Sequence, residues 1–264
     1  MTSAQMFGAS SRAVVVVGMG QLGALFARAW LERGRPVVPL LRTSDPSELA
    51  SLRPEATLVA VGEAALPSAL ESLPVSLTQS AVLVQNELLP CSWLGKLSEP
   101  TVAVVWFEKK GDRPPHSIRP SVLHGPRAAL VAEALERLEL PFQLAAAEQE
   151  RDHALVVKNL YILLLNLAGL RTGGSAGELL EGAPELVSAL SRELVQHQSA
   201  LLGRSLQLEP LMADVREAIH ADPQHGCRGR SAEERLARVL SQARAHGLTL
   251  PTVEALAQEH LAPR

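Results

Sequence analysis

A lysine within a long apolar stretch is the strongest candidate for acid–base chemistry in this sequence. Lys158 lies in residues 154–170, alongside the amide side chains of Asn159 and Asn166. An ammonium group in such surroundings must be paired, reach a solvated cleft or give up its proton. A lysine of this kind can protonate a carbonyl oxygen while the carbonyl carbon is reduced. The alternative is that Lys158 extends its ammonium group to solvent at the edge of a helix.

The element that must hold this lysine is a helix. Asn166 follows Lys158 by eight residues, or about two helical turns, so the two share one face with Ile162 between them. The stretch is short and polar for a membrane span. We therefore predict a helix buried in protein, and no membrane partner.

A glycine motif in the N-terminal part of the chain points to a nucleotide. The sequence GMGQLG, residues 18–23, follows the predicted strand Val14–Val17 and opens an apolar helical stretch that ends before Gly34. A second strand is predicted at residues 36–41. A G-x-G-x-x-G motif inside a β-α-β unit is typical of a dinucleotide-binding fold. The alternative is a glycine-rich turn that binds nothing.

Each glycine of this motif has a predicted task. Gly18 allows the tight turn, Gly20 lets a pyrophosphate approach the backbone, and Gly23 lets the helix pack closely on the strand. The free amide groups at the helix start favour the negative charge of phosphates. The predicted cofactor contacts in this loop are completed by Met19, Gln21 and Leu22.

The residue after the second strand favours NADP over NAD. An NAD site usually places an acidic residue there to hold the ribose hydroxyls, whereas this chain has Arg42, with no acidic residue before Asp45. An arginine suits a 2′-phosphate because its planar donor fork can pair with that group. The alternative is a solvated surface arginine. In the loop that follows, either Ser44 or Asp45 is placed to cap a short helix.

Composition sets the broad class of the protein. Of its 264 residues, 47% are hydrophobic and 20% charged, with a net charge of −3, which is typical of a soluble globular protein. There is no basic excess that would favour nucleic acid as a partner. Cys91 and Cys227 lack metal-type spacing, and no metal is expected. Free thiols favour a reducing compartment, so we predict a cytoplasmic protein with a loose tail at residues 1–12.

Alternating patterns predict an α/β fold, with an N-terminal Rossmann dinucleotide-binding domain at residues 1–147 and an all-α C-terminal domain at residues 148–264. The further predicted strands are residues 57–61, 81–84, 101–107, 121–123 and 142–145, and the N-terminal domain has further helices at 64–73 and 127–140. The C-terminal helices are predicted at residues 150–171, 183–202, 208–219, 231–246 and 252–261. Residues 173–177 are predicted to be a flexible connection.

Several segments, in order along nearly the whole chain, resemble the ketopantoate reductase (2-dehydropantoate 2-reductase) family. They are GMGQLG with VVPLLR, VLVQNE, GDRPPHSIRPSVLHGP, VVKNLYILLLN and QARAHG. The resemblance implies that Arg42 contacts NADP, that Asn86 lies beside the nicotinamide and substrate, and that Lys158 is catalytic. It also places a substrate-binding asparagine at Asn166 and, through GRSAE, a catalytic glutamate at Glu233.

The chain departs from the family pattern at several points. The asparagine expected one turn after the lysine is Ile162, so we expect a substrate pocket with fewer hydrogen-bonding groups. A lysine expected after the third strand falls at Gly62 or Glu63, and a serine before the glutamate is absent near Asp222. Such changes indicate an altered substrate.

Two of the implied site residues also have purely structural interpretations. Asn86 can be an ordinary turn residue after a strand. Glu233 can be an acidic residue in a first helical turn, next to a capping box formed by Ser231 and Glu234.

Together, these observations predict an NADPH-dependent reductase of a small 2-oxo acid or related carbonyl compound, with Lys158 as proton donor. The alternative is a non-catalytic NADP-binding sensor or partner protein that retains the fold. The long apolar helix and the helical second half are compatible with a homodimer.

Overall fold

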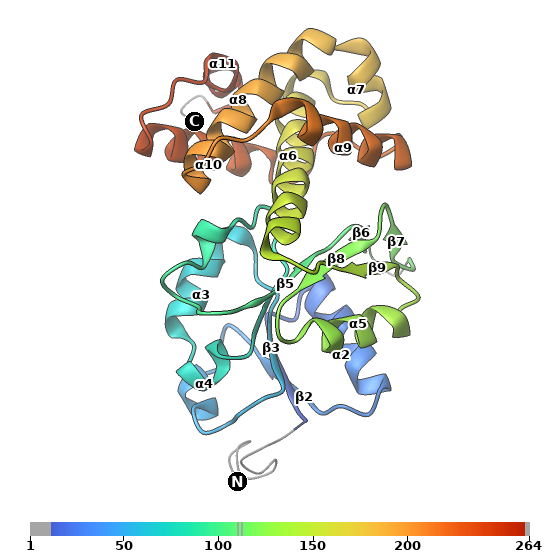
Figure 1. The fold of residues 1–264 in the computed structure, drawn as a ribbon, viewed down its shortest axis with the longest axis vertical. Coiled ribbons are helices and arrows are strands. Elements are labelled where there is room, and N and C mark those ends of the chain that lie inside the picture. The colour runs from blue at the N-terminus through green and yellow to red at the C-terminus, as the bar shows by residue number, and fades with distance from the viewer. Residues whose placement is uncertain (1–11, 110, 112, 262–264) are drawn as a thin grey trace. The chain divides into compact units, whose positions relative to one another are not determined.

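The computed structural model describes residues 12–109, 111 and 113–261. The predicted loose tail, apart from Arg12, lies outside these residues. Contacts between residues divide the chain into two compact units, residues 1–154 and 155–264. The N-terminal unit is α/β and the C-terminal unit is helical (Figure 1). The predicted fold class is therefore confirmed.

A seven-stranded sheet forms the centre of the N-terminal unit, in the order β2-β1-β3-β4-β5-β8-β9. All neighbouring strands run parallel except β5 and β8, which are antiparallel. The strands are β1 (Val14–Val17), β2 (Val37–Leu40), β3 (Ala56–Val59), β4 (Ala81–Leu83), β5 (Thr101–Val104), β8 (Ser121–His124) and β9 (Phe142–Leu144). The mainly parallel sheet agrees with the alternating sequence pattern.

Strand β1 lies inside the sheet, between β2 and β3. Val14 aligns with Val37 on one side and with Ala56 on the other. All four valines of β1 are buried, because helices cover both faces of the sheet. A run of β-branched residues suits such a strand, since each side chain packs against apolar neighbours whichever face it points to.

Helices cover both faces of this sheet. Helices α2 (Gln21–Glu32) and α5 (Ala128–Arg137) lie on one side, and α3 (Leu66–Ser72) and α4 (Val75–Thr78) on the other (Figure 1). Three short 3₁₀ helices, η1 (Pro46–Leu49), η2 (Glu63–Ala65) and η3 (Pro90–Ser92), lie in the loops. The buried Trp30 links α2 to α5, because its indole Nε1 donates to the carbonyl oxygen of Leu130 at 3.0 Å.

The strand predicted at residues 101–107 is divided into two parts. After β5 ends at Val104, the chain leaves the main sheet, and β6 (Phe107–Glu108) pairs with β7 (His116–Ser117) in a separate two-stranded sheet. The backbone amide of Trp106 donates to the side-chain hydroxyl of Ser121 at 3.1 Å. A continuous apolar run does not reveal this change of partner, which explains why the prediction was wrong here.

The C-terminal unit consists of helices joined by short loops. They are α6 (Glu148–Thr172), which begins in the N-terminal unit, α7 (Ala176–Gly182), α8 (Pro184–Leu202), α9 (Leu208–Ala221), α10 (Ala232–Ala245) and α11 (Pro251–His260). Glycine ends α8, because Gly203 adopts the left-handed conformation with φ +62°.

Helix α7 corrects the prediction of a flexible connection at residues 173–177. Ser175 caps this helix in a reciprocal arrangement, since its backbone amide donates to the Glu178 carboxylate at 2.8 Å while its hydroxyl accepts from the Glu178 amide. The sequence SAGE carries this capping signal. The glycines before it led to the interpretation as a loop.

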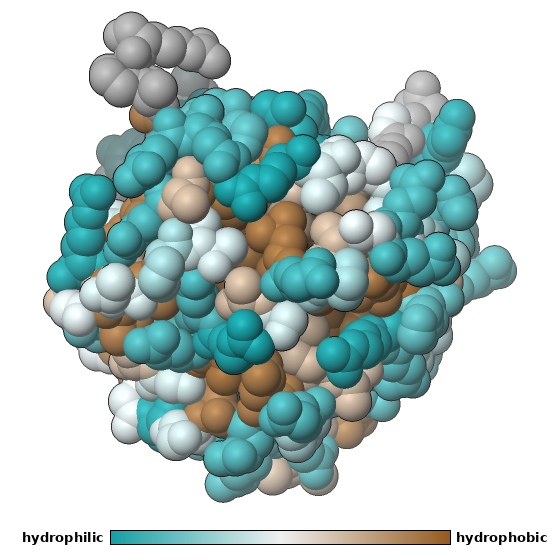
Figure 2. Space-filling model, turned by 90° about the horizontal axis from the view of Figure 1, so that it is seen from above, coloured by the Kyte–Doolittle hydropathy of each residue, from teal (hydrophilic) through white to brown (hydrophobic). Residues whose placement is uncertain are grey.

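Helix α6 is long and apolar enough to cross a membrane by length and composition alone, but 83% of its most apolar 18-residue window is buried within the protein. On the face of the molecule in Figure 2, hydrophobic areas are interspersed with hydrophilic side chains. The apolar composition of α6 is that of a helix packed in a protein core, as the sequence predicted.

Candidate functional site

The three glycines of the GMGQLG loop are in different environments. Gly18 has φ +89°, and a Cβ atom there would lie 2.8 Å from the carbonyl oxygen of Ala60. A Cβ atom on Gly23 would overlap the carbonyl oxygen of Gly18. Gly20 has an ordinary φ of −69°, and no described atom lies within 4 Å of its Cβ position. Gly18 and Gly23 are thus required by the protein's own packing, whereas Gly20 leaves open space.

The start of helix α2 presents unneutralised positive charge to this open space. Gly20 is the N-cap residue and has no side chain to bond the first amide groups, and the first turn contains no acidic residue. This turn begins with Gln21 and Leu22. Free amide groups and the helix dipole at such an end favour a bound anion.

A cavity of about 830 Å³ opens beside this helix start. Its wall joins the glycine loop to the residues after β2 and β3, so segments far apart in sequence share one space. Arg42 is the one charged residue among those that line it. The lining comprises Val17, Gly18, Met19, Gly20, Leu40, Leu41, Arg42, Ser44, Pro46, Ala60, Val61, Gly62, Ala65, Ser68, Ala69 and Ser72.

The acidic residue in the loop after β2, Asp45, is engaged in capping a short helix. Of the two candidate caps, Asp45 caps η1, because its carboxylate accepts from the amide of Ser47 at 2.9 Å. Hydrogen bonds from the backbone and the side chain of Ser47 lower the pKa of Asp45. Ser44 instead accepts from the amide of Leu41 at 3.1 Å. Arg42 is exposed and makes no ion pair among the residues that the structure describes, so its guanidinium group is available to a ligand.

Asn86 follows β4 and is held by a residue from the loop after β3. Its backbone amide donates to the Glu63 carboxylate at 3.2 Å. The neighbouring Gln85 is buried, and its side-chain amide donates to the carbonyl oxygens of Val59 and Val61 at 2.7 and 3.1 Å. These bonds fasten the ends of β3 and β4 to each other. No sequence motif indicates this role for Gln85, although Glu63 stands at one of the positions where a lysine was expected.

In the C-terminal unit, Lys158 is buried on α6. Its side chain is 6% exposed, and its Nζ lies 5.5 Å from the centre of the Tyr161 ring. Ile162, one turn later, is half-buried, whereas every other residue from Leu155 to Leu170 is buried. Between Leu155 and Leu170, Ile162 is therefore the residue of α6 least covered by the protein.

Asn166 lies one turn beyond Ile162 and is fixed at both ends of its amide group. Its Nδ2 donates to the carbonyl oxygen of Ile162 at 2.7 Å. Its Oδ1 accepts from the amide of Gly229 and from the guanidinium group of Arg235, both at 3.1 Å. Lys158, Ile162 and Asn166 occupy one helix face, as their spacing predicted. Arg235, which the sequence did not single out, adjoins this face.

Glu233 lies in the first turn of α10 and pairs with Arg228 at 3.3 Å. Its side chain is 43% exposed. The predicted capping box is wrong, because Ser231 is the N-cap residue but its side chain makes no capping hydrogen bond. Its ψ of 24° lies far from the extended value that points a serine hydroxyl at the helix amides.

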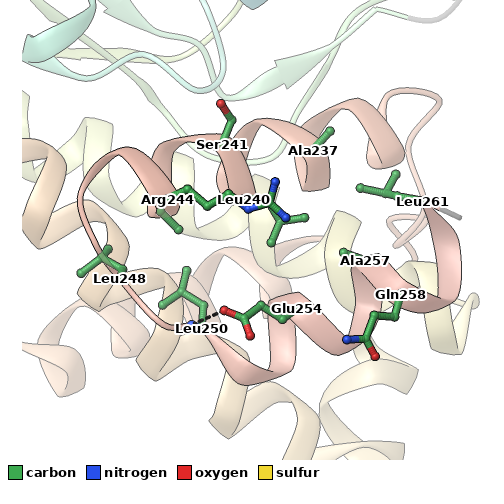
Figure 3. A pocket seen from close by; sticks show the side chains of 11 residues that line it. Ala237, Leu240, Ser241, Arg244, Leu248, Leu250, Glu254, Ala257, Gln258 and Leu261 are labelled. Atoms are coloured by element: carbon green, nitrogen blue, oxygen red, sulfur yellow. Dashed lines mark hydrogen bonds between the residues drawn. The ribbon is translucent and has the colours of Figure 1, made fainter. Parts of the chain in front are cut away.

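A second cavity of about 830 Å³ lies between α10 and α11 (Figure 3). Leucine side chains line much of it, and Arg244 and Glu254 are its charged residues. The carboxylate of Glu254 accepts from the amide of Leu250, the residue before α11, at 3.3 Å. The lining includes neither Lys158 nor Asn166. Across the described residues, no group of three or more His, Cys, Asp and Glu side chains is arranged to hold a metal ion.

Neither a protein-family model nor a curated protein matches the sequence. Solved structures match it in fold. One is a PanE/ApbA family ketopantoate reductase from Ralstonia eutropha, at 15% identity over 94% of this chain and 96% of that chain, with a TM-score of 0.65. A D-mandelate dehydrogenase with NADH and anilino(oxo)acetate matches at 11% identity over 93% and 96%, with a TM-score of 0.64.

A third match is a dimeric ketopantoate reductase from Staphylococcus aureus, at 16% identity over 95% of this chain and all of that chain, with a TM-score of 0.55. Two of these three structures are ketopantoate reductases, the family that the sequence segments resemble. Across nearly its full length, the chain shares the fold of ketopantoate reductase structures at low sequence identity.

Proposed function

We propose that this protein is an NADPH-dependent reductase of a small 2-oxo acid or related carbonyl compound. The observation that carries the proposal is the cavity that joins Gly20 at the start of α2 to Arg42 after β2. It combines an anion-binding helix start with a cation about one strand away, which is the arrangement that a dinucleotide phosphate requires. Similar structures include a dehydrogenase with NADH, which supports this class of ligand.

The residues around the cavity fit NADP. The open space at Gly20 gives a pyrophosphate access to the backbone, and no part of the described protein otherwise requires a glycine there. Arg42 and Ser44 offer donors to a 2′-phosphate. No carboxylate is among the lining residues, so the group that usually holds the ribose hydroxyls of NAD is missing from this wall.

The proposed reaction needs a proton donor and a means of orienting the carbonyl group. Bound NADPH would supply a hydride to the carbonyl carbon. Lys158 then donates a proton from Nζ to the carbonyl oxygen, and its apolar surroundings strengthen the electrostatic effect of its charge on that oxygen. Asn86 orients the reacting groups, with its backbone fixed by Glu63.

The remaining candidate residues shape the substrate site. Ile162 presents an apolar side chain where a hydrogen-bonding residue was expected, so we propose a less polar substrate than a polyhydroxylated acid. Asn166 contributes to substrate binding from the same helix face. Glu233 takes the place of the family's carboxylate, and must leave Arg228 to reach a substrate.

Nucleotide titration with the purified protein tests this function. We expect intrinsic fluorescence to report tighter binding of NADPH than of NADH, and absorbance at the nicotinamide band to fall when a suitable 2-oxo acid is added. Binding of NADPH without oxidation by any 2-oxo acid or related carbonyl would favour the alternative, a non-catalytic NADP-binding sensor. A lack of NADPH binding would contradict both.

The location and assembly of the protein are also proposals. Both cysteines, Cys91 and Cys227, are free thiols, which fits a reducing cytoplasm. A similar structure is described as dimeric, and we propose that this chain also forms a homodimer. Light scattering during gel filtration should give a mass near twice the chain's 28.2 kDa. A mass near 28.2 kDa at micromolar concentration would contradict a stable dimer.

A further inference from the structure

The cavity between α10 and α11 is not used by the proposed reductase. It measures about 830 Å³ and lies within the C-terminal unit. Neither the glycine loop nor Lys158 contributes to its lining. A space of this size, lined by apolar groups with a few polar ones, is typical of a small-molecule site. The chemistry of its wall indicates which ligand fits it.

Most of the wall is apolar. Its leucines come from α10, from the loop that follows, and from the end of α11, and they are Leu240, Leu248, Leu250 and Leu261. Water gains few hydrogen bonds against such a surface. An apolar group that covers these leucines removes their surface from water, which stabilises binding. The cavity therefore favours a ligand with an apolar body.

Two opposite charges border this apolar space. Arg244 lies on the α10 side and Glu254 on the α11 side (Figure 3). They form no ion pair with each other, and the Arg244 side chain makes no hydrogen bond with the residues that the structure describes. Both are exposed, so a ligand can reach them without a change in the helices. A ligand with one anionic and one cationic group could pair with both.

Each charge also suits the end of its own helix. Arg244 lies in the last turn of α10 and Glu254 in the first turn of α11, where charges of these signs are favourable. Helix-end electrostatics requires no cavity, however, whereas these two groups border the same apolar space. The experiment therefore needs control residues at helix ends that lie away from the cavity.

The surroundings favour a small molecule over a partner protein. A protein interface usually has apolar and aromatic side chains at its centre. The leucines of this cavity are buried or half-buried between the helices. The large hydrophobic side chains that are exposed among the described residues all belong to the N-terminal unit, and they are Met19, Leu31, Leu41, Val75, Leu94 and Leu144.

We propose that the cavity between α10 and α11 binds a small apolar zwitterion. The carboxylate of the ligand pairs with Arg244, its ammonium group pairs with Glu254, and its apolar part covers the leucines. Two kinds of molecule share this chemistry, namely amino acids with an apolar side chain and short apolar peptides with free ends. They differ in the separation of their two charged groups. The site does not depend on the proposed reductase function.

Calorimetry with the purified full chain, without nucleotide, tests the proposal. The probes are leucine and leucyl-leucine, their N-acetyl forms, which lack the ammonium charge, and their amides, which lack the carboxylate. We expect the wild type to bind one of the zwitterions at least about tenfold more tightly than either of its singly charged forms. Tighter binding of leucine would identify free amino acids as the ligands, and tighter binding of leucyl-leucine would identify peptides.

Two substitutions separate the charges. Arg244→Gln should weaken binding of the zwitterion and the N-acetyl form about tenfold and leave the amide within about threefold, and Glu254→Gln should leave the N-acetyl form and weaken the other two. Glu254→Gln keeps an oxygen that can accept from the Leu250 amide. The controls, Arg230→Gln and Glu185→Gln, should bind as the wild type does. Both residues are exposed and outside the lining, just before α10 and in the first turn of α8.

A third substitution fills the cavity and leaves its charges in place. Ala237 is exposed and lines the cavity, whereas Ala245 is exposed on the same helix but does not line it. Ala237→Trp should abolish binding, and Ala245→Trp should not. Light scattering should give Ala237→Trp the same mass as the wild type. A smaller mass would assign the cavity to contacts with a second copy of the chain and would overturn the proposal.

Other outcomes would also overturn the proposal. One is an absence of binding of both zwitterions at about 10 mM. Another is an equal loss of the N-acetyl and amide forms in Arg244→Gln, which would indicate a general effect on the helices. Undiminished binding by Ala237→Trp would place the ligand elsewhere. None of these measurements involves NADPH oxidation, so failure of the reductase and failure of this site are distinguishable.

Discussion

A Cβ atom on Gly23 would overlap the carbonyl oxygen of Gly18, so the first and third glycines of the loop pack directly against each other. Gly20 is different, because no described atom lies within 4 Å of its Cβ position. The packing of the described protein therefore does not require a glycine at residue 20. This contrast separates the effect of each glycine on stability from its effect on nucleotide binding.

The first prediction compares Gly23→Ala with Gly20→Ala. Gly23→Ala should lower the free energy of unfolding by about 1–3 kcal/mol, because the helix must move away from the loop. Gly20→Ala should leave the melting temperature unchanged or slightly higher, since φ −69° suits alanine. It should still weaken NADPH binding about tenfold, because the methyl group occupies the space proposed for the pyrophosphate. Thermal melts and fluorescence titrations measure these effects. Undiminished NADPH affinity in Gly20→Ala would contradict this site.

The second prediction concerns the choice of nucleotide. Arg42→Gln should weaken NADPH binding about 10- to 100-fold and leave NADH binding nearly unchanged, because the lost charge-assisted hydrogen bonds would be made to the 2′-phosphate alone. Arg53→Gln is the matched control, since Arg53 is also exposed but does not line the cavity. Parallel titrations with the two nucleotides measure the ratio. Equal losses for NADPH and NADH would indicate that Arg42 contacts another part of the nucleotide.

The sequence predicted the features that depend on local patterns. The valine run predicted β1, and the spacing of the three glycines predicted the strand-to-helix turn. The apolar stretch around Lys158 predicted a buried helix. In each case one short segment carries the whole signal. The same logic failed at Ser231, where the residues of a capping box are present but the backbone conformation does not form it.

The sequence could not predict contacts that depend on how distant loops meet. Arg235 and Asn166 are 69 residues apart, and Asn86 and Glu63 are 23 residues apart in different loops. Neither pair belongs to a motif with fixed spacing. Nothing in the chain around Arg235 distinguishes it from the other arginines of α10 until α6 places an amide oxygen beside it.

The third prediction tests Lys158. Lys158→Met keeps the length and packing of the side chain but removes the ammonium group, so kcat should fall about 100- to 10,000-fold while NADPH affinity stays within about threefold. Lys96→Met is the control, because Lys96 forms a surface ion pair with Glu71 at 2.7 Å. Stopped-flow measurement of a single turnover distinguishes a slower chemical step from slower product release. An unchanged single-turnover rate would exclude Lys158 as the proton donor.

The fourth prediction concerns acid stability and rests on His197 of α8. This side chain is 2% exposed. Its Nε2 forms a hydrogen bond with Gln242 at 3.1 Å, and its Nδ1 has no hydrogen-bond partner among the described residues. Burial, with a smaller contribution from the charge of His246, lowers its pKa to about 4 against the bond to Gln242, which raises it. The folded protein therefore favours the neutral imidazole.

Because the unfolded chain takes up the His197 proton near pH 6.5 and the folded protein only near pH 4, acid stabilises the unfolded state. Above about pH 6.5, His197 does not reduce the free energy of unfolding. Between about pH 6.5 and pH 4 the free energy of unfolding falls, and below pH 4 the total loss is about 3 kcal/mol. His197→Gln should reduce the loss of stability between pH 6.5 and pH 4, although its stability at neutral pH is lower. Urea unfolding at several pH values measures the difference, and His153→Gln, at an exposed histidine of α6, is the control. Parallel pH dependences in the wild type and His197→Gln would show that His197 is protonated equally readily in both states.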